Sequence, residues 1–379
     1  MTPLKVAIGA IAGVTGGPAT YAVELVRALA ALDDAQRLDL RVLTDRPDLF
    51  AALPRAQIEE IPLPSAWRQP WWDNAAVPRR LRALGADLYH GTKHALPLLP
   101  LGRRIARVVT IHDLAVLVEP ETFSLAQRLQ LAVHLRHAAS VADRIVCVSL
   151  HAAEDVRTRL GVAPERIAVV PHGIGAQFVP PADERRRQAV RRGYGVEEGF
   201  LVSFVGTAQP RKRIEVAVEA VARLRADGVP VTLVIAGRRR PGYAASWLES
   251  PPPFLRVVGE LEPERLVELY GASDVMVSPS SFEGFGLTFV EAMACGCPVV
   301  GVAATSVPEV VGQGGLLVER PDAALVAAAL ARLLGDPALR AETARQALLR
   351  AGELSWRRAA EQTRDVYLAA AQRAEAGRG

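Results

Sequence analysis

A chain of 379 residues is about twice the length of an ordinary domain, so two hydrophobic cores are expected. Half of the residues are hydrophobic and 23% are charged, a globular composition that excludes an intrinsically disordered chain. The net charge of +4 is a mild excess that suits phosphate-bearing substrates or anionic lipid. It is far below the charge of a dedicated nucleic-acid-binding protein, and no nucleic acid is expected as a partner.

The first half of the chain alternates short apolar runs with longer helical patterns, as in a parallel α/β sheet. Strands are predicted at 5–10, 38–43, 87–90, 105–111, 144–148 and 167–170, and helices near 19–32, 125–141 and 152–160. The apolar start contains glycines and leads into Gly16 and Gly17, so it is interpreted as a buried strand rather than a signal peptide. No other run is long enough to span a membrane, and we expect a cytoplasmic protein.

An exposed linker is predicted between Ile174 and Gly199, where Pro180-Pro181 is followed by the charge run 183–187. The alternation then restarts, with strands predicted at 200–205, 231–236, 255–258, 275–277 and 299–300. The sequence therefore predicts two doubly wound, Rossmann-like α/β domains, 1–178 and 179–354. The helical segment 355–379 is expected to pack on the outside, with the N-terminal domain as one candidate surface.

The stretch from Ser278 to Pro298 carries two acids, Glu283 and Glu291. Glu283 lies in a glycine-rich turn after a strand, and the apolar period from Leu287 starts a helix whose free N–H groups make a phosphate site. At about 1.5 Å per residue, the two carboxylates lie about 12 Å apart, about the length of a nucleoside diphosphate. One acid can thus meet a sugar while the other meets a ribose. Two solvated acids are the alternative, which the apolar neighbours of Glu291 disfavour.

Here the sequence resembles the retaining glycosyltransferases of the GT-B group usually called family 4, over nearly the whole chain. The resemblance implies two Rossmann-like domains that face a cleft, with the donor held by the C-terminal domain and the acceptor on the N-terminal side. In that family, two glutamates separated by seven residues contact the transferred sugar and the ribose hydroxyls, roles that fall on Glu283 and Glu291. The donor-binding turn between them comprises Gly284, Phe285, Gly286, Leu287 and Thr288.

A second match is the segment 205–214, where the family places a lysine against the donor pyrophosphate. Lys212 takes that role by position, as an exposed cation that serves turnover rather than folding. Many relatives carry an arginine where this chain has Thr207, and Arg211 is the expected substitute. Arg238 follows another strand and is a further candidate for phosphate contact. The alternative, a basic cap on a helix, is weakened because cations oppose the dipole at a helix N-terminus.

In the N-terminal domain, His112 and Asp113 follow the strand that ends at Ile111. His112 resembles the family histidine that reaches the transferred sugar, although a lone histidine is more often structural. The turn 13–17, with Gly16 and Gly17, resembles the family's first glycine loop beneath the diphosphate. It lacks the glycine spacing of a dinucleotide site.

The resemblance implies transfer of a hexose, of mannose or glucose type, from a nucleoside diphosphate sugar to a hydroxyl of a carbohydrate or lipid-linked acceptor. The resemblance also implies that the anomeric configuration is retained. It further implies a role in the synthesis of a cell-surface polysaccharide or glycolipid. The base, the sugar and the acceptor stay open, with GDP-mannose as a first guess. No Asp-x-Asp motif occurs, so neither a metal nor another cofactor is expected. The alternatives are a phosphorylase or sugar epimerase of the same fold, or a non-catalytic nucleotide-binding partner.

The segment from Trp67 to Arg82 holds three of the five tryptophans and the arginines Arg68, Arg79, Arg80 and Arg82. Such a mixture favours anionic headgroups or a lipid-linked diphosphate, and it predicts peripheral attachment to the inner face of the membrane. Ordinary packing of a loop and a helix is the alternative.

Overall fold

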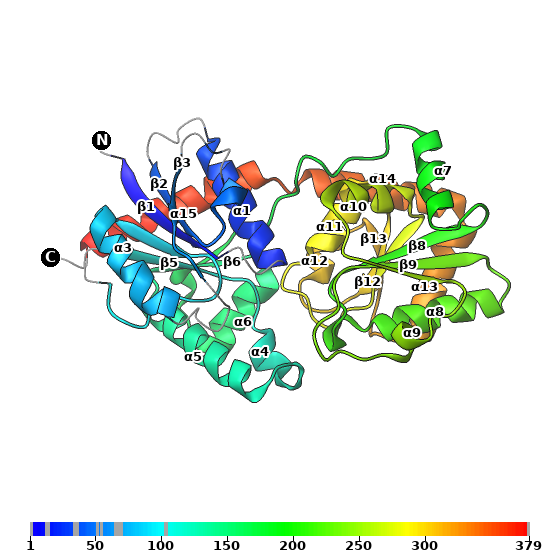
Figure 1. Ribbon diagram of the computed structural model, residues 1–379, viewed down its shortest axis with the longest axis horizontal. Coiled ribbons are helices and arrows are strands. Elements are labelled where there is room, and N and C mark those ends of the chain that lie inside the picture. Colours follow the sequence, from blue (N-terminus) through cyan, green and yellow to red (C-terminus); the bar gives the residue numbers. More distant parts are fainter. Residues whose placement is uncertain are drawn as a thin grey trace. The chain divides into compact units, whose positions relative to one another are not determined.

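The computed structural model describes residues 3–11, 16–32, 38–50, 53, 56–63, 71–101 and 105–376. It divides the chain into two compact units, one formed by 1–173 together with 355–379 and the other by 174–354. The second unit thus begins at Ile174, a few residues before the boundary placed after residue 178. Each unit contains one parallel sheet covered by helices on both faces (Figure 1), which confirms the predicted pair of doubly wound α/β domains.

The first unit is built on seven parallel strands in the order β3-β2-β1-β4-β5-β6-β7. The strands are β1 (Leu4–Ala10), β2 (Leu38–Thr44), β3 (Ala56–Glu60), β4 (Leu88–Gly91), β5 (Ala106–Ile111), β6 (Arg144–Cys147) and β7 (Ile167–Val169). The helices are α1 (Gly17–Ala30), α3 (Val77–Leu84), α4 (Ala115–Val118), α5 (Leu125–Val141), α6 (Leu150–Leu160) and α15 (Trp356–Ala376), and the π-helical segment η4 covers Trp72–Ala76. The central strands read as continuous apolar runs because both faces of the sheet are covered.

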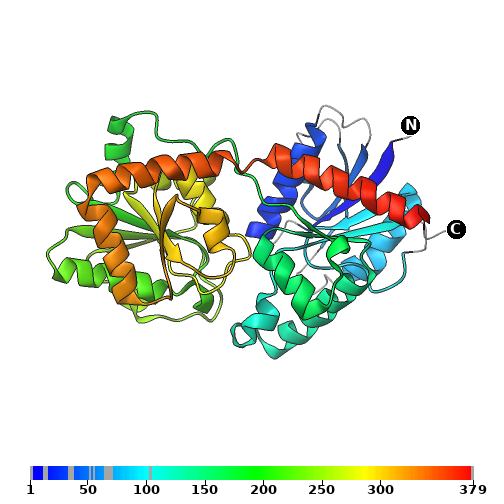
Figure 2. The same ribbon diagram turned by 180° about the vertical axis from the view of Figure 1, so that it is seen from behind.

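Helix α15 returns from the end of the chain and completes the core of the first unit, where Figure 2 shows it in red beside α1. Tyr367 and Trp356 are buried against Leu25 and other residues of α1 and the sheet. Helices α3, α5 and α6 cover the opposite face. The C-terminal helix, predicted to pack on the outside with the N-terminal domain as one candidate surface, is part of the first unit and contributes to its core.

The second unit is built on six parallel strands in the order β10-β9-β8-β11-β12-β13. The strands are β8 (Phe200–Val205), β9 (Val231–Ala236), β10 (Leu255–Gly259), β11 (Val275–Ser278), β12 (Val299–Val302) and β13 (Gly315–Val318). The helices are α7 (Glu184–Gly193), α8 (Ile214–Ala226), α9 (Ser246–Glu249), α10 (Pro263–Ala272), α11 (Leu287–Ala294), α12 (Val307–Val311), α13 (Ala323–Gly335) and α14 (Pro337–Gly352). Within the described residues, no helix is both long and apolar enough to cross a membrane.

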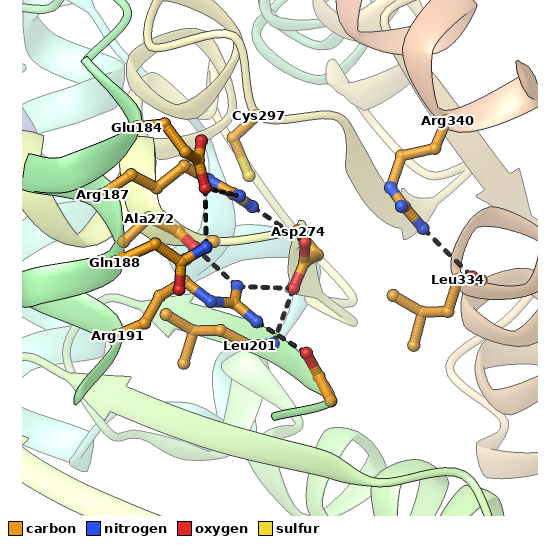
Figure 3. A network of polar contacts seen from close by, with 12 residues as sticks. Glu184, Arg187, Gln188, Arg191, Leu201, Ala272, Asp274, Cys297, Leu334 and Arg340 are labelled. Carbon is orange, nitrogen blue, oxygen red and sulfur yellow. Dashed lines mark hydrogen bonds and ion pairs between the residues drawn. The ribbon is translucent and has the colours of Figure 1, made fainter. Parts of the chain in front are cut away.

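The charge run predicted as an exposed linker is instead the start of α7, which Asp183 caps by accepting the Arg186 N–H. Buried Asp274 anchors this helix to the sheet (Figure 3), because it accepts hydrogen bonds from Arg191, from Arg187 and from the backbone N–H of Leu201. The Arg191 guanidinium also donates to the carbonyls of Ala272, at 3.1 Å, and Gly199, at 2.6 Å. Both charges therefore lie in a fully hydrogen-bonded network, as buried ions require.

Replacing Arg191 with alanine is expected to lower the free energy of unfolding of the second unit by about 3–5 kcal/mol, since Asp274 would keep a buried charge without its main partner. Neighbouring Arg192 is exposed and provides a matched control. The Arg192→Ala variant should change stability by less than about 0.5 kcal/mol in urea titrations. Equal effects of the two substitutions would show that the network contributes nothing.

Candidate active site

The candidate site of the second unit lies where the strand order reverses, between β8 and β11. Ligands of doubly wound sheets bind outside the carboxyl ends of strands at such a switch point. The loop after β8 contains the one-turn helix Pro210–Lys212, and the loop after β11 leads through Glu283 into α11. The sheet thus brings together two segments that are 71 residues apart in the sequence.

A buried ion pair joins these two loops. The Lys212 ammonium donates to Glu283 Oε1 at 2.5 Å, and both residues are at most 7% exposed. Arg211 donates to the Phe282 carbonyl at 2.6 Å and lies 3.5 Å from Glu283 Oε2. Burial opposes ionisation of Glu283, but the charges of Lys212 and Arg211 lower its pKa to about 2. The expectation of an exposed cation at Lys212 is wrong, because a buried carboxylate in the adjacent loop takes it as a partner.

A third loop, after β12, holds the Glu283 turn from the backbone side. The Glu283 N–H donates to Thr305 Oγ1 at 3.0 Å, and the Ser306 hydroxyl donates to the Glu283 carbonyl at 2.9 Å. Thr305 has a φ of 51°, an unfavourable backbone conformation for a β-branched residue. Backbone strain of this kind persists where surrounding contacts over-determine the structure, often at functional sites. Sequence analysis missed both residues, since no motif marks them.

The turn from Gly284 to Thr288 is shaped by Gly286, the N-cap of α11. Gly286 has a φ of 92°, and a Cβ atom there would meet Phe289 Cδ2 at 2.9 Å, so only glycine fits. Phe285 is buried, whereas Gly284, Leu287 and Thr288 remain partly accessible. The first N–H groups of α11 therefore follow directly after Glu283 in an open turn, as an anion site at a helix N-terminus requires.

Glu291 occupies a different environment on α11. Tyr270, on α10, donates to Glu291 Oε2 at 2.9 Å, and none of the described cations forms an ion pair with this carboxylate. Desolvation raises the pKa of Glu291 to about 7, although the bond from Tyr270 opposes the rise. Arg238, the other predicted phosphate ligand of this unit, is exposed and pairs with Glu260 at 2.6 Å.

In the first unit, His112 is buried beyond the end of β5. Its Nε2 atom lies 2.8 Å from the Thr92 carbonyl, so Nε2 carries the proton and Nδ1 is an acceptor. Its backbone N–H lies 3.3 Å from His94 Nδ1, and its ring stacks on His172. Burial and the neighbouring His94 lower the pKa of His112 to about 3, so the ring stays neutral near neutral pH.

The other predicted residues of the first unit lie at the starts of helices. Asp113 accepts the Ala115 N–H at 3.0 Å and so supports the start of α4. Gly16 is the N-cap of α1, with a φ of 127°, and Gly17 is the first residue of that helix. The rest of the predicted glycine loop, 13–15, lies outside the described residues.

A small crevice that sequence analysis missed lies where the strand order of the first sheet reverses, between β1 and β4. Asp73, Tyr89, Thr92 and Lys93 are among its lining residues, and its volume of about 10 Å³ suits one water molecule. Desolvation lowers the pKa of Lys93, against the charges of Asp73 and Asp45. In the described part of the chain, Lys93 forms no ion pair, and Asp73 lies on a π-helical turn, a feature frequent at functional sites.

The tryptophan-rich segment is only partly described, since Trp67 and Arg68 lie outside the described residues. Trp72 is buried and donates through Nε1 to the Ile61 carbonyl at 3.1 Å, as expected for core packing. Arg80 pairs with Glu59, and Arg82 donates to the Pro78 carbonyl. Among the described residues, no group of three or more histidine, cysteine or acidic side chains is placed to hold a metal ion.

Comparison with known proteins gives matches to two family descriptions. Residues 187–350 match "Glycosyl transferases group 1", and residues 15–178 match "Glycosyltransferase Family 4". A D-inositol 3-phosphate glycosyltransferase of Salinispora arenicola is 36% identical over 248 residues, which span 60% of this chain and 54% of that relative. The O-antigen chain mannosyltransferase B of Escherichia coli is 28% identical over 300 residues, which span 76% of this chain and 77% of that one. The chain therefore spans about half the length of the first of these relatives.

A similar solved structure is Anabaena HepE in complex with UDP-glucose, with a TM-score of 0.75 and 20% identity. The likeness covers 96% of this chain and 99% of HepE, and it bears on the fold alone. With the paired parallel sheets, such likenesses confirm the predicted GT-B fold.

The raised pKa of Glu291 gives a testable effect on stability. The folded protein retains the Glu291 proton up to about pH 7, whereas the unfolded chain releases it near pH 4.5. This carboxyl group therefore lowers the stability of the fold progressively as pH rises through that window. Glu291→Gln keeps the shape without the charge and should be more stable than the wild type at about pH 8, by about 1–3 kcal/mol. The difference should vanish near about pH 4.5 in denaturant titrations, and a pH-independent difference would contradict the assignment.

Proposed function

Because the chain belongs to the group 1 glycosyltransferases of family 4, we propose that it moves a hexose, of mannose or glucose type, from a nucleoside diphosphate sugar to a hydroxyl acceptor. We further propose that the anomeric configuration is retained and that the product is a cell-surface polysaccharide or glycolipid. The observation that carries this proposal is the cluster of buried Glu283 and Lys212 with half-buried Arg211 at the switch point of the second sheet. One relative is named a mannosyltransferase, which supports a hexose as the transferred group. Another is named a D-inositol 3-phosphate glycosyltransferase, which supports a hydroxyl group as the acceptor.

The proposed donor site is assigned from the charged side chains and the helix N-terminus of the second unit. Lys212 and Arg211 would bind the pyrophosphate and stabilise the negative charge that grows on it as the sugar leaves. The turn from Gly284 to Thr288 would contribute N–H groups to the same phosphates. Glu283, kept ionised, would accept hydrogen bonds from the sugar hydroxyls, and Glu291 would accept those of the ribose. No metal or other cofactor enters the proposal, because the side-chain cations supply the positive charge.

The proposed transfer needs no carboxylate nucleophile. The leaving phosphate oxygen would take the proton of the acceptor hydroxyl on the same face of the sugar, while the chain orients both partners. On the acceptor side, neutral His112 would accept a hydrogen bond from a sugar hydroxyl through Nδ1.

The role of Lys212 is tested by Lys212→Met, with Arg213→Met as the control because Arg213 is the exposed neighbour in the same basic run. We expect turnover with the nucleotide sugar to fall by about 10²–10³ in the first variant, as when a charge-stabilising group is removed, and to change little in the second. Lys212→Met should also unfold more easily, since Glu283 loses its partner. The turnover of the two variants is compared with that of the wild type, using purified protein whose fold has been checked by circular dichroism. Full turnover in folded Lys212→Met would refute the proposed site.

Binding of the donor is expected to depend on pH through Glu291. A protonated Glu291 accepts fewer hydrogen bonds, so affinity for the nucleotide sugar should fall about tenfold from about pH 8 to about pH 6. A nucleotide sugar is the appropriate probe because its pyrophosphate does not titrate in this range. Calorimetry with UDP-, GDP-, ADP- and dTDP-sugars identifies the base, and the Glu291→Gln variant should bind more weakly with no pH dependence. An unchanged affinity in that variant would remove Glu291 from the donor site.

A further inference from the structure

Thr305, in the loop after β12, has a backbone conformation that its side chain disfavours. The loop turns from the end of β12 at Val302 to the start of α12 at Val307, whose N–H donates to the Ala304 carbonyl at 3.1 Å. Thr305 is the first central residue of this turn, and its φ is 51°. A turn with positive φ at that position normally has glycine, asparagine or aspartate there. Threonine is β-branched, so the turn is built with a residue that strains it.

Positive φ is confined to three non-glycine residues of the described chain. His94 lies in the loop after β4, Arg213 in the loop after β8, and Thr305 in the loop after β12. Of the three, Thr305 alone is β-branched. Strain of this kind persists where surrounding contacts over-determine the structure. Thr305 is therefore expected to make a contact that an unstrained glycine could not make.

That contact is a hydrogen bond to the backbone of Glu283. Thr305 Oγ1 accepts the Glu283 N–H at 3.0 Å, and the next residue, Ser306, donates through its hydroxyl to the Glu283 carbonyl at 2.9 Å. Two consecutive side chains thus hold the N–H and the carbonyl of a single residue that lies in another loop. Glycine at position 305 would relieve the strain, but it would lack the first of these hydrogen bonds.

The other end of Glu283 is held by cations. Lys212 and Arg211 lie 2.5 Å and 3.5 Å from its carboxylate oxygens. With its backbone fixed by Thr305 and Ser306, Glu283 is therefore restrained at both ends of the side chain. Groups that act on a bound substrate need such restraint, because a displacement of about 1 Å can lower turnover about 100-fold. A hydroxyl that fixes the backbone of Glu283 bears directly on where its carboxylate meets a ligand.

We propose that Thr305 is a positioning residue of the donor site, which acts on the transferred sugar through Glu283. Its hydroxyl fixes the peptide group that precedes the Glu283 Cα atom, and the strained backbone at Thr305 is retained for the sake of that hydroxyl. This inference rests on the proposed function, in which Glu283 accepts hydrogen bonds from the sugar. Turnover should therefore follow the presence of a hydroxyl at position 305, whereas stability should also follow the strain of the backbone.

Three substitutions separate the hydroxyl from the strain. Thr305→Ser keeps the hydroxyl and should retain most of the wild-type turnover with the nucleotide sugar. Thr305→Ala and Thr305→Gly both lack it, and turnover in each should fall by about 10- to 100-fold. The glycine variant should nevertheless unfold at a higher temperature than the alanine variant, because glycine adopts positive φ without strain. A merely structural role would instead give turnovers that follow stability, with glycine above alanine.

A second measurement separates the sugar from the nucleotide. Calorimetry with UDP, GDP, ADP and dTDP identifies the diphosphate that the wild type binds, and Thr305→Ala should bind it as tightly as the wild type does. The defect of this variant should lie in kcat for the nucleotide sugar, because Glu283 is displaced relative to the sugar and not to the nucleotide. A loss of affinity for the diphosphate as large as the loss of turnover would show a general distortion of the site and overturn the proposal.

Arg213 provides the matched control for strain alone, since it has a φ of 46° and is exposed. Arg213→Gly should be more stable than Arg213→Ala, as in the Thr305 pair, but turnover should be unchanged in both. Wild-type turnover in folded Thr305→Ala would overturn the role of Thr305 alone. If the alanine variant does not fold, the unstrained glycine variant gives the same answer. Absence of transfer by the wild type from UDP-, GDP-, ADP- and dTDP-sugars would instead refute the proposed function, and the role of Thr305 with it.

Discussion

A carboxylate and an ammonium group that are both removed from water hold together the loops of the candidate site in the second unit. Neither Glu283 nor Lys212 can lose its partner without leaving a buried charge, so the loops after β8 and β11 are held at a fixed separation. The loop after β12 then fixes the backbone on both sides of Glu283 through Thr305 and Ser306. The unfavourable φ of Thr305 is tolerated because its hydroxyl is needed at that point. Three loops at one edge of a parallel sheet thereby become a single rigid structure.

Within this structure, two glutamates eight positions apart have pKa values shifted in opposite directions. Lysine and arginine hold the pKa of Glu283 at about 2, whereas Glu291 accepts a hydrogen bond from the Tyr270 hydroxyl and has a pKa of about 7. Environment rather than residue type therefore decides which carboxyl group is permanently charged. A fixed charge suits a group that orients a ligand at every pH. A carboxyl group poised near neutrality gains its charge most readily when a ligand supplies hydrogen bonds to it.

The sequence predicted the parts of the fold that leave a strong local signal. Central strands such as β8 and β9 were predicted with their observed bounds, because a strand covered on both faces is a continuous apolar run. The edge strands β3 and β13 were missed, since their side chains are only partly buried and β3 carries two glutamates. Glu283 and Lys212 were predicted as site residues from a family motif, but their ion pair and the burial of Lys212 depend on the adjacency of β8 and β11. Thr305 and Tyr270 act through single tertiary hydrogen bonds, which no local pattern reveals.

Two helices of the first unit differ in where they place their apolar residues. Helix α15 is rich in alanine and arginine, and its Trp356 and Tyr367 are buried; Tyr367 continues a chain of hydrogen bonds through His90 and Thr110 to Tyr21, beside the ring of His112. The end of the chain thus helps to shape the surroundings of the candidate histidine. Helix α5 also places apolar residues on its inner face, but it repeats them on the face in contact with water. Since hydration of large apolar side chains is unfavourable, Leu125, Leu129 and Val133 on that face add nothing to the stability of the isolated unit.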